Sequence, residues 1–150
     1  APTERLGLEI EPLHARAVVV MPPSHRLASR RRIRIADLRE ERLVALVEHN
    51  VFANPLPTDL AELMQRASVT TPLTGIACAL VASGAGIAVV DPFSAAGFAD
   101  GAIVAVPLEA AVAIRIAIVT SANRSLSAIS REFIDALRAD VLALDRFRRR

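Results

Sequence analysis

The segment from Leu73 to Pro92 constrains the fold of this chain more than any other, because it combines a helix, a glycine stop and a buried strand. Apolar residues recur at steps of three and four through its first half, which predicts a helix with one apolar face. Gly84 stands where a helix C-terminus favours a left-handed residue, and 86–90 is an apolar run typical of a strand inside a parallel sheet. Ligands of open α/β sheets bind beyond the carboxyl ends of such strands, so Asp91 is a candidate site residue.

Predicted strands and helices alternate along the rest of the chain, which indicates an α/β fold with a largely parallel sheet. Besides 86–90, the predicted strands are 16–21, 43–47, 68–71, 103–107 and 112–120, with 6–10 an edge strand or the end of a loop. A helix is predicted at 59–67, and Ser125 caps a final one. We expect that final helix to have one apolar face, formed by Leu126, Ile129, Phe133, Leu137, Val141 and Leu144. The last strand and this helix need a sheet to dock on, and the first twenty residues offer little to build one.

The composition favours a single domain with an aliphatic core. The chain has 150 residues, 53% of them hydrophobic, and its five aromatic residues are all Phe. The lack of Tyr and Trp weakens any function that depends on stacking against bases or sugars. The formal net charge is only +2, and every cation is an arginine. Arg30, Arg31, Arg32 and Arg34 form a local block, which is either a solvated loop and strand edge or a phosphate-binding patch without interleaved aromatics.

Motifs of other protein classes are missing from the sequence. The single cysteine, Cys78, cannot form an internal disulfide, and on an apolar helix we expect it to be inert packing. Without HxxxH or CxxC spacing we expect no metal site, and no GxSxG elbow or phosphate-binding GxxxxGK loop is present. A helix precedes the glycines at 84 and 86 and a strand follows, which is the reverse of the dinucleotide fingerprint. Neither a membrane span nor a signal-peptide core is found, so we expect a cytoplasmic location.

Four motifs, in order and with natural spacing, resemble the LysR-type transcriptional regulators. They are the strand 13–22 with the "HPLA"-like turn Ser24-His-Arg-Leu-Ala28; Ile35-Ala-Asp-Leu38 before Leu43-Val-Ala-Leu46; the "V-A-x-G-x-G-I" signature at 81–90; and the closing "F-I-x-x-L" helix at 126–137. Arg26 replaces the usual proline of the turn. The ending Val89-Val-Asp-Pro-Phe93 departs from the commoner leucine-proline ending and is similar to the branch that senses opines and other amino-acid derivatives.

The resemblance implies a type II periplasmic-binding-protein-like fold, with two Rossmann-like subdomains that have mixed or mostly parallel sheets. Residues 1–150 would then be a partial effector-binding domain. The second lobe would be complete at about 22–113, whereas 1–21 and 114–150 would be the crossovers and the remnants of an incomplete first lobe. The crossovers between the lobes are expected near 18–22 and 114–119. The family's winged helix-turn-helix and linker helix have no counterpart here, so the chain is interpreted as the C-terminal half of a longer regulator.

The resemblance also implies where an effector would bind. In the family, contacts come from the loop after the strand that matches 43–47 and from the start of the glycine-signature helix. The ligand-binding candidates are therefore Glu48, His49, Asn50, Val51, Thr71, Thr74 and Asp91. Backbone N–H groups at the helix start favour a carboxylate, and Asp91 favours an ammonium or guanidinium group, so we expect an amino-acid-like effector.

Each candidate also has a simpler explanation. His49 is explained as an exposed loop histidine, Glu48 as the partner of a nearby arginine, and Asp91 as a turn or N-cap residue before Pro92. Thr71 is explained as the extended residue before a proline, and Thr74 as a helix-face residue.

We therefore expect an effector-sensing, non-catalytic regulatory domain without a cofactor. It would bind a small polar metabolite, associate into homodimers or homotetramers, and reach DNA only through the missing N-terminal domain. The alternatives are a solute-binding protein of a transport system with the same fold, and an enzyme such as a dehydratase or deaminase, for which no acid–base pair is evident.

Overall fold

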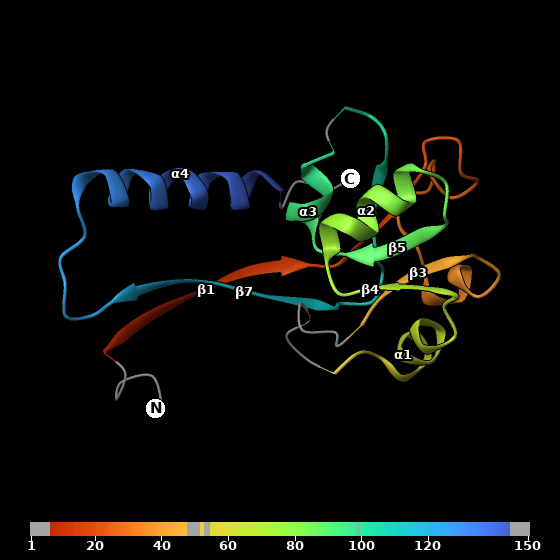
Figure 1. Ribbon diagram of the computed structural model, residues 1–150, viewed down its shortest axis with the longest axis horizontal. Coiled ribbons are helices and arrows are strands. Elements are labelled where there is room, and N and C mark those ends of the chain that lie inside the picture. The colour runs from red at the N-terminus through yellow and green to blue at the C-terminus, as the bar shows by residue number, and fades with distance from the viewer. Residues whose placement is uncertain (1–6, 48–51, 53–54, 99, 145–150) are drawn as a thin grey trace.

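A computed structural model describes residues 7–47, 52, 55–98 and 100–144 of the chain (Figure 1). In chain order the elements are β1 (Leu8–Arg16), β2 (Val18–Met21), a 3-10 helix (Ile35–Leu38), β3 (Leu43–Leu46), α1 (Thr58–Gln65), β4 (Val69–Thr71), α2 (Thr74–Ala82), β5 (Ile87–Val90), α3 (Pro92–Ala96), β6 (Val104–Pro107), β7 (Ala113–Ser121) and α4 (Ala128–Leu144). The expected α/β class is confirmed by this alternation.

The strands form two separate sheets. β1 and β7 make a two-stranded antiparallel ribbon, and the other strands make a five-stranded sheet in the order β4-β3-β5-β2-β6. β3 runs parallel to both β4 and β5, whereas β2 runs antiparallel to both β5 and β6. The larger sheet is therefore mixed rather than largely parallel. The reason is that β2 follows the ribbon directly and begins beside the last residue of β5, because Val18 is paired with Val90. It therefore runs in the direction opposite to β5.

The core of the five-stranded sheet is aliphatic, as the composition predicts. Every residue of β2, β3 and β5 is buried. Ala77, Cys78 and Val81 of α2 are fully buried, and so is Leu60 of α1. Strands buried on both faces read as continuous apolar runs, which is why these strands could be found in the sequence.

Two glycines before β5 have positive φ angles, and for Gly84 this confirms the left-handed residue predicted at the end of the helix. Gly84 has a φ of +84° and follows α2, where the N–H of Ala85 donates to the carbonyl oxygen of Leu80 at 2.9 Å. Gly86 has a φ of +152°, and a β-carbon there would collide with the carbonyl oxygen of Arg42. That same oxygen accepts a hydrogen bond from the N–H of Ile87 at 2.8 Å, so the close approach is what joins β5 to β3.

The ribbon corrects two of the sequence expectations. The strand expected at 16–21 is broken at Ala17, whose N–H donates to the carbonyl oxygen of Val112 at 2.9 Å. β1 is paired with β7 along its whole length, from Leu8 opposite Ser121 to Arg16 opposite Ala113, and so is longer than the edge strand expected at 6–10. The chain passes between the ribbon and the larger sheet at Ala17 and Val112, slightly before each expected crossover.

The last helix is less buried than the sequence suggests. α4 lies along the ribbon (Figure 1) and buries Ile134 and Val141. Two residues of the expected apolar face are largely exposed, Ile129 at 80% and Phe133 at 67%, so that face is only partly buried. The apolar stripe of α4 is wider than the surface that a ribbon of two strands offers to it.

Candidate functional site

The carboxyl ends of three neighbouring strands meet at one edge of the larger sheet. Leu46 at the end of β3 is paired with Thr71 at the end of β4, and the N–H of Val47 donates to the carbonyl oxygen of Thr71 at 3.0 Å. Asp91 follows directly after β5, which is the other neighbour of β3. We call this edge, formed by Val47, Thr71 and Asp91, the rim. Two of the predicted site residues, Thr71 and Asp91, lie at the rim, and the predicted segment 48–51 follows directly after Val47. This is the end of the sheet at which open α/β proteins bind ligands.

The rim is set apart by burial of polar groups. Among the residues that the structure describes, the two buried polar side chains are Thr71 and Asp91, each 4% exposed, and both lie here. Burying a polar group costs free energy unless it is hydrogen-bonded, so each needs a partner. A polar pair buried at the edge of an otherwise aliphatic sheet is the kind of feature that orients a ligand.

Asp91 is the N-cap of α3. Its Oδ1 accepts a hydrogen bond from the N–H of Ser94 at 2.7 Å, and its Oδ2 accepts one from Oγ of Ser94 at 2.8 Å. Pro92 occupies the first helical position, where its missing N–H is harmless. The N-cap interpretation is therefore confirmed, and the role of Asp91 as a ligand contact stays a prediction.

Thr71 and Thr74 lie at the start of α2. Oγ1 of Thr71 accepts a hydrogen bond from the N–H of Leu73 at 3.3 Å, and Thr74, which is half-buried, is the first residue of the helix. The N-cap of α2 is Leu73, which offers no side-chain acceptor to the first turn. An uncapped helix start leaves backbone N–H groups and the positive end of the helix dipole available to an anion. In this respect α2 differs from α3, whose first turn is capped by Asp91.

The predicted residues Glu48, His49, Asn50 and Val51 lie outside the described residues, so their part in the site stays a prediction. Their flanks are placed. Val47 is at the rim, and Phe52 is buried and forms an antiparallel bridge with Ile114 of β7. The burial of Phe52 is missed by the sequence analysis, which predicts no element between the strand 43–47 and the helix 59–67. A lone Phe in that interval is the signal that could have found it.

The thiol of Cys78 lies beneath the rim and is unreactive. Its side chain is fully buried, and desolvation raises its pKa to about 11, helped by the negative charge of Asp91. The thiol is therefore protonated at neutral pH and lacks the thiolate that a nucleophile needs. This agrees with the expected packing role.

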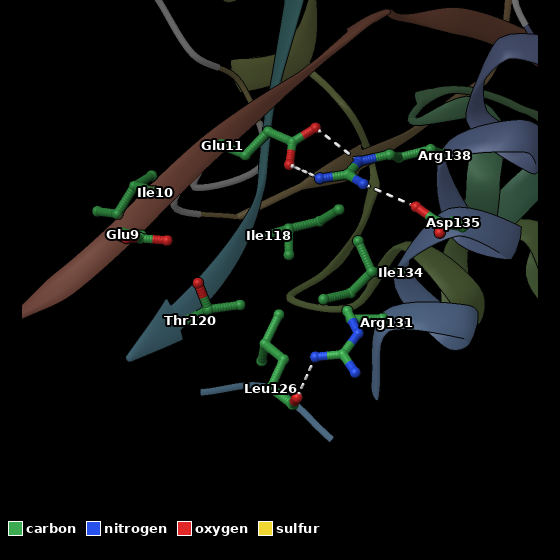
Figure 2. A pocket seen from close by; sticks show the side chains of 10 residues that line it. All are labelled: Glu9, Ile10, Glu11, Ile118, Thr120, Leu126, Arg131, Ile134, Asp135 and Arg138. Carbon is green, nitrogen blue, oxygen red and sulfur yellow. Dashed lines mark hydrogen bonds and ion pairs between the residues drawn. The ribbon is translucent and has the colours of Figure 1, made fainter. Parts of the chain in front are cut away.

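A hollow of about 480 Å³ lies between the ribbon and α4 (Figure 2). Ile118 of β7 and Ile134 of α4 point into it from opposite sides, and Leu126 closes one end. The hollow has charged residues along its border, chief among them Arg138 on α4 and Glu11 on β1.

Arg138 joins α4 to the ribbon through a two-point contact. Its Nε and one terminal nitrogen donate to the two carboxylate oxygens of Glu11 at 3.0 and 2.6 Å, and its other terminal nitrogen donates to Asp135 at 2.8 Å. These contacts lower the pKa of Glu11 and raise the pKa of Arg138. Both residues are missed by the sequence analysis. They are 127 positions apart, and no local pattern connects them.

Within residues 7–47, 52, 55–98 and 100–144, no three His, Cys, Asp or Glu side chains gather in a way that could hold a metal ion. No helix in the described part of the chain is long and apolar enough to cross a bilayer.

Comparison with known proteins adds the family. Residues 2–141 match the profile of the LysR substrate binding domain. The octopine catabolism/uptake operon regulatory protein OccR of Rhizobium meliloti is 34% identical over 99 residues, which are 66% of this chain and 33% of OccR. The LysR family regulator HinK of Pseudomonas aeruginosa has a similar fold, with a TM-score of 0.57 and 21% identity over 91% of this chain and 49% of HinK.

The regulatory domain of CcmR from Synechocystis PCC6803, solved in complex with 2-PG, also has this fold. The TM-score is 0.57 at 20% identity, and the match covers 89% of this chain and 67% of that domain. The chain spans less than half of the length of OccR or HinK. The structural likeness confirms the expected periplasmic-binding-protein-like architecture of LysR regulatory domains, and the profile match over 140 consecutive positions shows that this chain belongs to the LysR substrate-binding domain family.

Proposed function

We propose that the chain is the effector-sensing part of a LysR-type regulator and that its rim binds a small, polar, amino-acid-like or carboxylate metabolite. The observation that carries this proposal is the position of Thr71 and Asp91. They are the two buried polar side chains of the described residues, and they flank the end of β3, from which 48–51 continue. Glu48, His49, Asn50, Val51 and Thr74 complete the proposed contacts.

The polarity of the rim suits a ligand that has both a carboxylate and a cationic group. The uncapped first turn of α2 offers N–H donors to a carboxylate. Asp91 offers a negative charge to an ammonium or guanidinium group. Each of its oxygens accepts one hydrogen bond from Ser94, and a carboxylate oxygen can accept a second one. The octopine-related role in the name of OccR supports such a ligand class, and the complex of the CcmR regulatory domain with 2-PG supports the coarser point that a domain of this fold takes a small ligand.

The proposal includes a two-lobed domain of which the second lobe, about 22–113, is complete here and the first is partial. The exposed apolar half of α4, with Ile129 and Phe133, supports this, because such a stripe needs a further surface to cover it. The ligand would act through its different affinity for two arrangements of the lobes or subunits, in a homodimer or homotetramer. DNA would be contacted by a separate N-terminal domain, in the cytoplasm, and no catalytic step is involved.

The two rival functions have less support. A solute-binding protein of a transport system would have the same fold, but OccR and HinK are named as regulators. An enzyme would need a nucleophile or an acid–base pair at the rim. The nearby thiol of Cys78 is protonated. Of the three residues that define the rim, Asp91 alone is an acid or base, so the rim as described holds no acid–base pair.

An NMR titration of the chain with octopine, its parent amino acids and a neutral aromatic compound tests the proposal. We expect the amide signals of Thr74, Gly75 and Ser94 to shift with the amino-acid derivatives only. Asp91→Asn should abolish these shifts while preserving α3, because Asn caps helices about as well as Asp. Ser94→Ala is the matched control, since it weakens the cap but keeps the charge. Binding of neutral aromatics alone would contradict the proposal.

A further inference from the structure

The arginines of this chain are concentrated in one segment. Residues 26–42 contain seven arginines and three carboxylates, an excess of four positive charges, although the whole chain has a net charge of only +2. The remainder of the chain is therefore slightly acidic. The block at 30–34 that the sequence analysis leaves open between a solvated loop and a phosphate-binding patch is part of this segment.

The basic segment lies at the edge of the larger sheet opposite to the rim. β2 runs from Val18, which is paired with Val90, toward Val20, which is paired with Ala88. β3 then begins at Leu43, beside Ile87 at the start of β5. The connection between β2 and β3 is thus at the amino-terminal edge of the parallel strands. In Figure 1 it forms the orange loops at the end of the molecule away from the ribbon.

Three arginines of this edge surround a hollow of about 340 Å³. Arg39 and Arg42 come from the basic segment, and Arg66 comes from the end of α1. Leu38, Leu43, Leu63 and Ala67 also line the hollow, together with Ser68, whose hydroxyl is a further donor. Arg39 and Arg66 also line an adjoining hollow of about 170 Å³, together with Asp59 and Glu62.

The three guanidinium groups have no partner within the described part of the chain, where neither a hydrogen bond nor an ion pair is made by their side chains. Other arginines differ in this respect: Arg34 is paired with Asp37, and Arg138 with Glu11. Glu41 also borders the hollow, but its carboxylate is held by Nε2 of His25 at 3.1 Å and by the guanidinium of Arg26. The carboxylate of Glu41 is therefore already engaged by the side chains of His25 and Arg26.

Three exposed arginines that line one hollow and have no acidic partner within the described part of the chain can direct several N–H donors at a single anion. Arginine stays charged at all physiological pH values and forms two-point hydrogen bonds with phosphate oxygens. The three side chains have the charge and the donors for a phosphate group, and apolar residues hold them apart. Asp59 and Glu62 line the adjoining hollow with Arg39 and Arg66, but neither carboxylate forms an ion pair with them among the residues that the structure describes.

We propose that the hollow formed by Arg39, Arg42 and Arg66 is a second ligand site, specific for phosphate groups and separate from the rim. The phosphate can come from a free phosphate compound or from the backbone of DNA, and both sources use the same chemistry. This site is independent of the proposed effector site, because it lies at the opposite edge of the sheet and shares no residue with it.

Isothermal titration of the 150-residue chain with pyrophosphate at low salt is the first test. The variant R39Q/R42Q/R66Q removes the charges of the hollow, and R30Q/R31Q/R32Q removes the same number of charges from the neighbouring loop, outside both hollows. We expect the first variant to weaken binding by at least about tenfold, and the second by less than about threefold. Equal losses of affinity in both variants would mean diffuse electrostatic attraction and would overturn the proposal. The proposal would also fail if neither pyrophosphate nor DNA bound to the unmodified chain.

A second measurement does not depend on variants. Titration of the labelled chain with pyrophosphate should shift the amide signals of Arg66 and Ser68 and leave those of the rim unchanged. A parallel titration with a random-sequence DNA duplex distinguishes the sources. One outcome is that the duplex binds, pyrophosphate does not, and only R39Q/R42Q/R66Q loses duplex binding. The site is then supported, and its phosphate is that of the DNA backbone. Shifts confined to 30–32 would refute it.

Discussion

The five-stranded sheet and the ribbon with α4 are two parts of one chain that bury their apolar residues very differently. In the sheet, β2, β3 and β5 have four residues each, and all of these residues are buried. In the ribbon and α4, Ile10, Val119, Ile129 and Phe133 are all at least 46% exposed. The difference teaches that the strands of the sheet are covered by its own helices, although Leu73 and Ile76 beside and on α2 stay exposed, whereas a two-stranded ribbon cannot cover the apolar residues of α4.

The largest difference is expected from truncating a side chain in the sheet. Ile87→Ala removes a side chain that is 1% exposed, at the point where β5 pairs with β3. The loss of burial and the resulting cavity should lower the free energy of unfolding by about 3 kcal/mol. Urea denaturation followed by circular dichroism measures this. A loss below about 1 kcal/mol would mean that the core of the sheet adjusts easily, and the comparison would fail.

The glycine before β5 tests the same region by overpacking. Gly86→Ala places a β-carbon against the carbonyl oxygen of Arg42 at a φ of +152°, and should cost at least about 2 kcal/mol. Gly84→Ala is the control, because its left-handed φ of +84° is unfavourable but the space around it is open. We expect about 1 kcal/mol there. Equal effects in denaturation experiments would show that the close approach of Arg42 to Gly86 is unimportant.

The stabilisation that the ion pair between Glu11 of the ribbon and Arg138 of α4 contributes should depend on pH. Arg138 lowers the pKa of Glu11 below its ordinary value of 4.5, so the ionised form of Glu11 is favoured by folding. The resulting stabilisation is present above that ordinary value and is lost as the pH falls through the lowered pKa. Glu11→Gln should therefore melt slightly below the unmodified chain at neutral pH, and the two should converge in acid. A difference that persists in strong acid would point to lost packing instead.

The smallest effect is expected on the exposed face of α4. Phe133→Ser changes a side chain that is 67% exposed, so the free energy of unfolding should change by no more than about 0.5 kcal/mol. The same variant should reduce self-association in light scattering if this face is a contact surface. A loss of stability comparable to that of Ile87→Ala would show that Phe133 is covered in solution, and the contrast between the two regions would disappear.

The sequence predicts best those elements whose signals are local. The helix stop at Gly84, the buried strand that follows, and the N-cap at Asp91 all appear within the run from Leu73 to Pro92, and the structure has each of them. Apolar runs, glycine conformation and capping are properties of a few neighbouring residues, so they can be read without knowing the fold.

The failures concern features that depend on distant parts of the chain. The antiparallel direction of β2 follows from its entry through the ribbon, and the exposure of Phe133 follows from how little surface the ribbon offers. The pairing of Glu11 with Arg138 joins opposite ends of the sequence. For the candidate site, sequence reasoning identified Asp91 and Thr71 as residues of the rim, but it gave no sign that the two would be the buried polar pair.

The double passage of the chain at Ala17 and Val112 has a mechanical consequence. Two strands leave the sheet side by side and are tied together where the N–H of Ala17 donates to the carbonyl oxygen of Val112 at 2.9 Å. This bond and the cross-strand pairs of β1 and β7 join the two connections, so that they can move only together. The 17-residue helix α4 is bound to the ribbon through Arg138 and also contacts α3, so any tilt of the ribbon against the sheet must carry α4 across α3.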